Sequence, residues 1–240
     1  MASPPRRSLR AMALVALVLA AGCTALPVTD GQASGPESTV ESFSYPSGWS
    51  QDGIADLSVA LRTHDETLRN TSRRSRMVTA DGDANRTVVR TFDAGNDTVS
   101  IRWSDTEFGR TLRHYLSAEG VFAYDPATEE LTRNPRENWT PAEVAFHDGV
   151  RRPLTALELD ATETVTVEGR TAVRYNVTGI EDPGDVPADD ASGHVVVTEA
   201  GYIAAYDVTR GNDDFSLRTA YEVTEFGNAT VTRPAWLPEE

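Results

Sequence analysis

The residue with the clearest capacity for chemistry is Cys23, the single cysteine of the 240-residue chain. Its thiol is a nucleophile that can accept a lipid group, and the small residues Ala20, Ala21 and Gly22 directly before it would let a processing enzyme approach the backbone. One cysteine excludes an internal disulfide framework, a Cys-based zinc site and a CxxC redox pair. We therefore predict that Cys23 is lipidated.

Residues 1–22 have the three parts of a secretory signal: a start with three arginines, an apolar run of about a dozen residues, and small residues before Cys23. The run is shorter than a transmembrane helix, which needs roughly 17–25 residues. The pair Arg6-Arg7 resembles a twin-arginine export signal, and residues 19–23 resemble the lipobox of prokaryotic lipoproteins. A plain cleaved signal with an incidental cysteine is the alternative. We expect the mature protein to be anchored by lipid to the outer side of the cell membrane.

A second set of reactive positions is formed by asparagines in Asn-x-Ser/Thr sequons, the acceptor pattern for N-linked glycans. Six of the eight asparagines have this context: Asn70, Asn85, Asn96, Asn138, Asn176 and Asn228. Threonine-rich strands and turns also generate the pattern, so unmodified sequons are the alternative. We predict glycosylation at some of these positions.

Motifs for catalysis or metal binding are absent from the sequence. The four histidines have no HxH or HExxH spacing, and there is no GxSxG, GxxxxGK[ST] or GxGxxG motif. The acidic run from Glu181 to Asp190 is interpreted as a solvated loop, with calcium binding as the alternative. We therefore assign no catalytic residue, no metal and no cofactor.

The formal net charge is −15, and all 22 basic residues are arginine. This charge argues against a nucleic-acid partner. Removal of the signal with its three arginines gives a net charge of −18. The negative charges repel one another, and this repulsion is screened in molar salt, where the Debye length is about 3 Å. The composition is typical of halophilic proteins. Two groups of arginines either face anionic lipid headgroups or neutralise nearby acids: Arg73, Arg74 and Arg76, and Arg151 with Arg152.

Three segments follow the signal. Residues 23–47, rich in Pro, Gly, Ser and Thr, predict a flexible tether, and residues 48–240 predict one folded domain. Ile54, Leu57, Leu61 and Leu68 recur at helical spacing, which predicts a helix with Ser50 or Asp52 as its N-cap.

Beyond Asn70 the apolar period changes to two, which predicts eight to twelve antiparallel strands, interrupted by one or two short helices within 138–159. The expected order is one helix, five or six strands, the helical insertion, and five or six more strands. Four residues on apolar strand faces are candidates for a ligand cavity, with ordinary core packing as the alternative: Trp103, Phe215, Leu217 and Tyr221.

This pattern resembles the LolA-like family of lipoprotein carriers, in particular lipoproteins of that type from halophilic archaea. The resemblance rests on the lipobox, the helix opened by GWSQDGIADLSVAL, the strands, and a closing segment, YEVTEFGNATVTRPAW, similar to the family's final hairpin. It implies an α+β fold, a half-barrel of curved antiparallel sheet with helices covering its concave face. It also implies a concave face that holds an acyl chain or another apolar group.

The leading hypothesis is a lipid-anchored, non-enzymatic protein that binds or transfers an apolar ligand, either a lipid or the acyl chain of a lipoprotein. The alternative is a structural or adhesive envelope glycoprotein whose half-barrel is filled by its own side chains. A hollow concave face favours the first hypothesis and a solid one the second. A hydrolase would require a histidine and a carboxylate to converge in a cleft.

Overall fold

The computed structural model describes residues 39–134, 140–145, 150–181 and 188–238. The predicted signal, Cys23 and most of the predicted tether lie outside these residues. The last part of the predicted tether, 39–47, belongs to the folded domain, because it contains a short 3-10 helix, Val40–Ser42, and the core residue Phe43.

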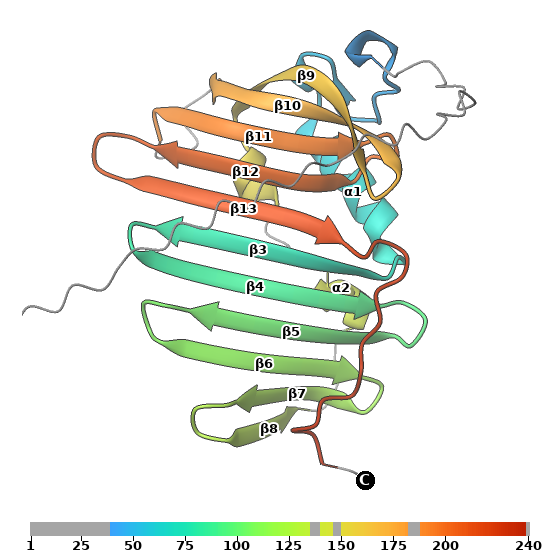
Figure 1. The fold of residues 1–240 in the computed structure, drawn as a ribbon, viewed down its shortest axis with the longest axis vertical. Helices are drawn as coiled ribbons and strands as arrows, with labels where there is room; N and C mark the ends of the chain where they lie inside the picture. The colour runs from blue at the N-terminus through green and yellow to red at the C-terminus, as the bar shows by residue number, and fades with distance from the viewer. Residues whose placement is uncertain (1–38, 135–139, 146–149, 182–187, 239–240) are drawn as a thin grey trace, which may run out of the picture. The chain divides into compact units, whose positions relative to one another are not determined.

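Eleven antiparallel strands form a single large sheet (Figure 1). Their order across the sheet is β8-β7-β6-β5-β4-β3-β13-β12-β11-β10-β9, so the first and last strands of the series, β3 and β13, pair at its centre. In chain order the strands are β3 Arg73–Asp81, β4 Ala84–Asp93, β5 Thr98–Asp105, β6 Arg110–Ser117, β7 Gly120–Asp125, β8 Glu130–Asn134, β9 Leu157–Val167, β10 Arg170–Ile180, β11 Asp190–Thr198, β12 Ile203–Gly211 and β13 Ser216–Thr224.

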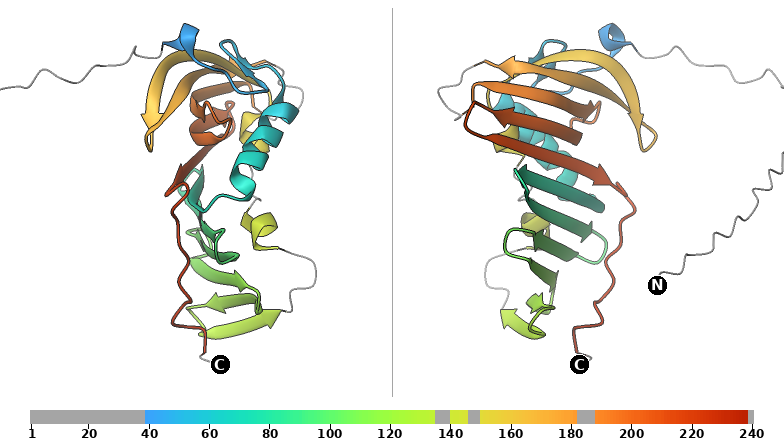
Figure 2. Two further views of the ribbon diagram at one scale, coloured as in Figure 1. Left: turned by 90° about the vertical axis from the view of Figure 1, so that its right-hand side faces the viewer. Right: turned by 60° about the vertical axis from the view of Figure 1, so that its left-hand side comes forward.

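The described helices lie on one face of this sheet, which we call the concave face (Figure 2). They are α1 Leu57–Arg69, α2 Pro141–Ala145 and α3 Arg151–Leu154. Six strands separate α1 from the short helices and five follow them, as the periodicity predicted. The predicted fold class, a curved antiparallel sheet with helices on its concave face, is confirmed.

Helix α1 begins later than the sequence predicted. Its N-cap is Asp56, whose carboxylate accepts a hydrogen bond from the Val59 N–H at 3.0 Å. The predicted caps and Ile54 belong instead to a small hairpin, β1 Trp49–Ser50 and β2 Gly53–Ile54, which packs beside β9. The predicted start was therefore wrong, because Ile54 contributes to this hairpin rather than to the first turn of the helix.

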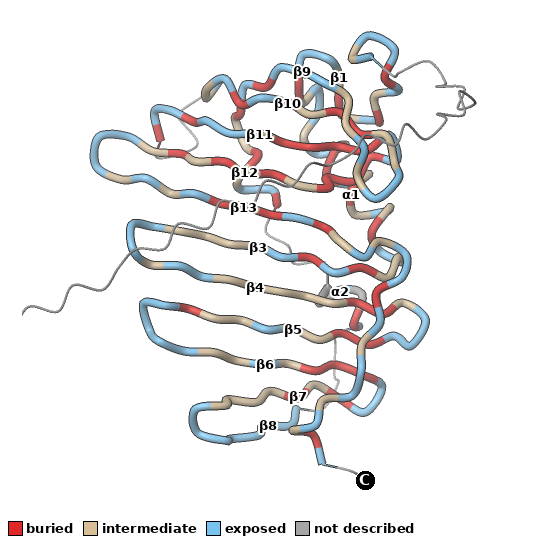
Figure 3. Tube along the Cα trace, viewed as in Figure 1, coloured by how far each residue is buried: buried red, intermediate tan, exposed pale blue. Residues whose placement is uncertain are grey.

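The main core lies between α1 and the strands β9 to β13. Four buried residues of α1 face the sheet at helical spacing: Ala60, Leu61, His64 and Leu68. Figure 3 shows many of the buried residues of the sheet in β10 to β13. Bulges in the β9–β10 and β11–β12 pairs accompany the curvature here. Gly193, at φ +130°, permits the close approach of β12, since a Cβ there would lie 1.9 Å from the Asp207 carbonyl oxygen.

The C-terminal segment, residues 225–238, forms no final hairpin and crosses the opposite, outer face of the sheet (Figures 1 and 2). Trp236 stacks on Tyr124 at 5.2 Å between ring centroids, and Arg233 donates to both carboxylate oxygens of Glu119 at 2.7 and 2.8 Å. Pro234, which cannot donate to a strand ladder, explains why this segment does not continue the sheet as the resemblance implied.

Candidate functional site

The concave face is covered unevenly. Helix α1 lies on the half formed by β9 to β13, while the short helix α2 lies on the other half, mainly over β4 and β5. On β4 and β5, the inward-facing side chains of Val88, Ile101 and Trp103 are consequently only half-buried, whereas Phe92 and Val99 at one end of these strands are buried. Figure 3 shows much of β4 and β5 in the tan colour of intermediate burial. The described residues line two hollows on this face, one beneath α2 and one beside α3.

The first, which we call the α2 hollow, has a volume of about 510 Å³. Its walls come from β4, β5, β6, β7 and α2, and seven of its nine lining residues are aliphatic or aromatic. They are Val88, Arg90, Ile101, Trp103, Leu112, His114, Leu116, Val121 and Val144. A volume in this range and an apolar lining with few polar groups are characteristic of small-molecule sites.

Strand register explains why these side chains gather. Successive residues of a strand point to opposite faces, and cross-strand partners share a face. Met77 pairs with Val88, Val88 with Trp103, and Trp103 with Leu112. These four residues form one apolar row across β3 to β6, and Tyr221 of β13, the partner of Met77, extends it.

The second hollow, which we call the α3 hollow, has a volume of about 320 Å³ and lies at the other end of this row. Met77, Val208, Phe215 and Leu217 are apolar residues of its lining. Its complete lining is Met77, Thr79, Arg86, Arg152, Pro153, Ala188, Val208, Arg210, Phe215, Leu217 and Thr219. The α3 hollow therefore differs from the α2 hollow in containing three arginines.

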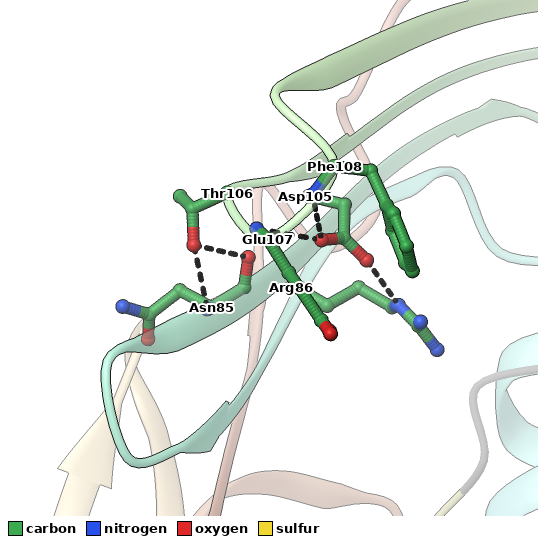
Figure 4. A network of polar contacts seen from close by, with 6 residues as sticks. All are labelled: Asn85, Arg86, Asp105, Thr106, Glu107 and Phe108. Carbon is green, nitrogen blue, oxygen red and sulfur yellow. Dashed lines mark hydrogen bonds and ion pairs between the residues drawn. The ribbon is translucent and has the colours of Figure 1, made fainter.

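Arg86 lies between the two hollows. Its Nε donates to Asp105 Oδ2 at 3.1 Å, and its guanidinium carbon is 5.8 Å from the centroid of the Trp103 ring. Asp105 is itself fixed, because its Oδ1 accepts from the backbone N–H groups of Glu107 and Phe108 (Figure 4). The turn at the end of β5 therefore holds Arg86 in place over the indole.

Burial sets the charge of two further lining residues. It lowers the pKa of His114, which favours the neutral imidazole in the α2 hollow. In the α3 hollow burial is also the main cause that lowers the pKa of Arg210, and the charge of Arg152 adds to it. The α2 hollow thus contains one arginine, Arg90, beside an imidazole whose neutral form is favoured, while the α3 hollow contains three arginines.

The structure separates the four predicted ligand residues. Trp103 lines the α2 hollow, whereas Phe215 and Leu217 line the α3 hollow. Tyr221 lines neither hollow: it is 2% exposed and stacks on Tyr206 in the core beneath α1. Ligand binding by these residues stays a prediction, and the structure adds Val88, Leu112 and the three arginines as candidates.

Five of the six sequon asparagines lie in the described residues, and all five are exposed: Asn70, Asn85, Asn96, Asn176 and Asn228. Asn138 and Cys23 lie outside the described residues. Accessibility is what a glycan requires, and glycosylation itself stays a prediction.

The described histidines do not converge. His64 is buried under α1, where its Nδ1 accepts from the Ile203 N–H at 3.0 Å, His114 lines the α2 hollow, and His194 lies on β11. Within the described ranges no group of three or more His, Cys, Asp or Glu side chains is placed to hold a metal ion, and no helix is long and apolar enough to cross a membrane. His147 and most of the predicted acidic loop lie outside the described residues.

Of the arginines predicted to face headgroups or neutralise acids, Arg74 and Arg76 lie 3.8 and 3.9 Å from Glu225 and Glu222. Arg73 is buried and donates to the Leu68 carbonyl at the end of α1. Arg152, in contrast, lines the α3 hollow. The neutralising interpretation therefore fits Arg74 and Arg76, and a ligand-facing position fits Arg152.

Together these features define a curved antiparallel sheet whose concave face is only partly covered by helices and contains apolar hollows. The chain belongs to the family of unknown function DUF7537, whose profile matches residues 8–240. Among curated proteins, no sequence match was found.

Several solved structures are similar in fold. LprF from Mycobacterium bovis shares 8% identity over 76% of this chain and 97% of its own, with a TM-score of 0.41. The lipoprotein LppX from Mycobacterium tuberculosis shares 10% identity over 71% of this chain and 94% of its own, with a TM-score of 0.38. A LolA superfamily protein from Nitrosomonas europaea shares 8% identity over 73% of this chain and 94% of its own, with a TM-score of 0.28.

Proposed function

We propose that this protein binds an apolar ligand, a lipid or the acyl chain of a lipoprotein, on the concave face of its sheet. The observation that carries the proposal is the α2 hollow, about 510 Å³ of space with a lining of mostly aliphatic and aromatic side chains. Removal of a methylene from water contributes about 0.8 kcal/mol. A hydrocarbon chain in the hollow would therefore be bound by the hydrophobic effect. Binding would remove from water both the surface of the chain and the half-exposed apolar surface of the wall.

The N-terminal sequence supports the proposed location of this binding site at the membrane surface. Lipid attached to Cys23 would anchor the chain at the outer side of the cell membrane after export, and residues 24–38 would separate the anchor from the folded domain. Such an arrangement would place the hollows within reach of membrane lipid. Binding and release require no bond to be made or broken, so the proposed role is non-enzymatic.

The hollows also bear on the alternative function, an envelope glycoprotein with a self-filled half-barrel. Exposure of all five described sequon asparagines supports a glycoprotein. A solid concave face, however, was the feature that would distinguish a structural role, and the two hollows favour ligand binding. Glycosylation and ligand binding are compatible, since none of these asparagines lines a hollow.

The experiment is a titration with N-phenyl-1-naphthylamine, a neutral apolar dye that fluoresces when it leaves water. Ile101→Trp fills the α2 hollow, and Arg102→Trp is its matched control, because Arg102 is exposed on the opposite face of the same strand. The expected result is saturable binding by the wild type and Arg102→Trp, and weaker binding by Ile101→Trp. Equal binding by all three proteins would contradict a site in the α2 hollow.

A further inference from the structure

The α3 hollow is a concentration of positive charge in a strongly acidic chain. The sequence has 37 acidic and 22 basic residues, yet the described residues that line this hollow include three arginines and no carboxylate. Apolar floor and basic wall occur together, since Met77, Val208 and Leu217 lie beside Arg86, Arg152 and Arg210. This combination matches a ligand that is apolar in one part and anionic in another.

Arg210 explains how two arginines come to share one site. Its guanidinium donates to the carbonyl oxygens of Arg152, Pro153 and Thr155, which ties α3 to β12. These bonds satisfy both terminal nitrogens with carbonyls rather than a carboxylate, so no carboxylate of the described residues neutralises the charge by hydrogen bonding to them. The Nε of Arg210 is buried and has no hydrogen-bond partner among the described residues. Arg152, exposed at the wall of the hollow, adds a second charge.

Arg86 stands on the side of the hollow nearest the apolar row. It is held by Asp105 through Nε, and its side chain remains 55% exposed. Its position over Trp103 places a cation where the α3 hollow meets the α2 hollow. A molecule that crosses from one hollow to the other along Met77 and Val88 would therefore pass beside Arg86.

We infer that the ligand is an anionic amphiphile, with its carboxylate or phosphate group beside Arg152 and Arg210 in the α3 hollow and its chain along Met77 and Val88 into the α2 hollow. The inference rests on the proposed binding of an apolar chain. The exposed guanidinium of Arg152 can match either anion, because paired N–H donors fit the oxygens of a carboxylate or a phosphate. Arg210, whose terminal nitrogens are already bonded to carbonyl oxygens, contributes its positive charge rather than paired donors. Contacts at hydrogen-bond distance are about as long as the Debye length in molar salt, so they are screened much less than longer-range attraction.

The test is displacement of bound N-phenyl-1-naphthylamine by three ligands with the same chain: dodecanoate, dodecyl phosphate and dodecanol. All titrations use salt at which circular dichroism shows the folded protein. A charge-assisted hydrogen bond contributes enough to make at least one anion act at about tenfold lower concentration than the alcohol. The anion that acts at the lowest concentration distinguishes a carboxylate from a phosphate headgroup.

Arg152→Gln should remove most of this preference, and Arg86→Gln combined with it should lower the preference further, leaving only the contribution of Arg210. Arg151→Gln is the matched control, because Arg151 is the exposed neighbour on α3 that does not line the hollow, and it should keep the wild-type preference. Equal displacement by the alcohol and both anions in the wild type would overturn the headgroup inference and leave apolar binding intact. Absence of dye binding and of displacement by all three would overturn the proposed function as well.

Discussion

The guanidinium of Arg86 lies over the indole of Trp103, 5.8 Å from carbon to ring centroid, at the point where the two hollows of the concave face adjoin. One residue lines the apolar hollow and the other lines the basic hollow. This contact lies between the two hollows, so a ligand that occupies both hollows would pass beside Arg86 and Trp103.

Arg210 is expected to be the main attachment of α3 to the sheet. Arg210→Met leaves three carbonyl oxygens without their donor, and buried polar groups without partners are costly, so the free energy of unfolding should fall by about 3 kcal/mol. Urea unfolding followed by circular dichroism measures this. Arg218→Met, which removes an exposed arginine paired with Asp207, is the control and should leave the midpoint unchanged. Equal effects of the two substitutions would contradict the assigned role.

His64 should make stability depend on pH below neutrality. Burial, with a smaller contribution from the charge of Arg73, lowers its pKa from 6.5 to about 3. The unfolded chain therefore takes up a proton as the pH falls below about 6.5, while the folded chain does not until about pH 3. The free energy of unfolding should decrease as the pH falls, at up to about 1.4 kcal/mol per pH unit from this group.

Urea unfolding at pH 7, 6 and 5 tests this dependence. His64→Asn keeps a hydrogen-bond acceptor near the Ile203 N–H and removes the titration, so its slope against pH should be shallower than that of the wild type. The comparison is one of slopes, which makes it independent of any general loss of stability in the variant. Parallel slopes would show that His64 is not the group responsible.

The C-terminal segment is expected to stabilise the outer face of the sheet. Trp236→Ala removes an aromatic stack on Tyr124 and apolar contact area, which should lower the free energy of unfolding by about 1–3 kcal/mol. Phe108→Ala, at a side chain that is 67% exposed, is the control and should have little effect. Thermal melts of the two variants give the comparison, and an unchanged Trp236→Ala melt would argue that the segment is not packed as described.

Cys23→Ala should release the protein from membranes. Lipid on this thiol is the proposed anchor, and the described residues contain no helix able to cross a membrane. Fractionation of cells that express the wild type and the variant, followed by immunoblotting, measures the partition. A variant that remains in the membrane fraction would refute the anchor at Cys23.

Much of the fold could be predicted because the apolar period is clear. Val99, Ile101 and Trp103 alternate with polar residues and do face the same side of β5, and the helix near residue 60 has four buried positions at helical spacing. Its start could not be placed, because Ile54 fits a helical pattern and a short strand equally well. Only the tertiary contact of β2 with β9 assigns it to the hairpin.

The site was harder to predict because it depends on what lies above the sheet. Trp103 and Tyr221 have similar sequence surroundings, yet α1 buries Tyr221 and leaves Trp103 in a hollow. The distance that a helix extends across a sheet is not encoded in the alternation of strand residues. Arg210 and Arg152 are 58 positions apart, and their proximity depends on how α3 folds back on β12.

The most direct measurement of the central claim is native mass spectrometry of protein purified without detergent. Ligand binding on the concave face predicts a mass above that of the chain and its covalent groups, and this excess disappears when the same sample is denatured. An organic extract of the denatured sample should then contain the released ligand, and this ligand should carry an anionic group. A native mass equal to the denatured mass, together with failure to bind N-phenyl-1-naphthylamine, would contradict the proposal.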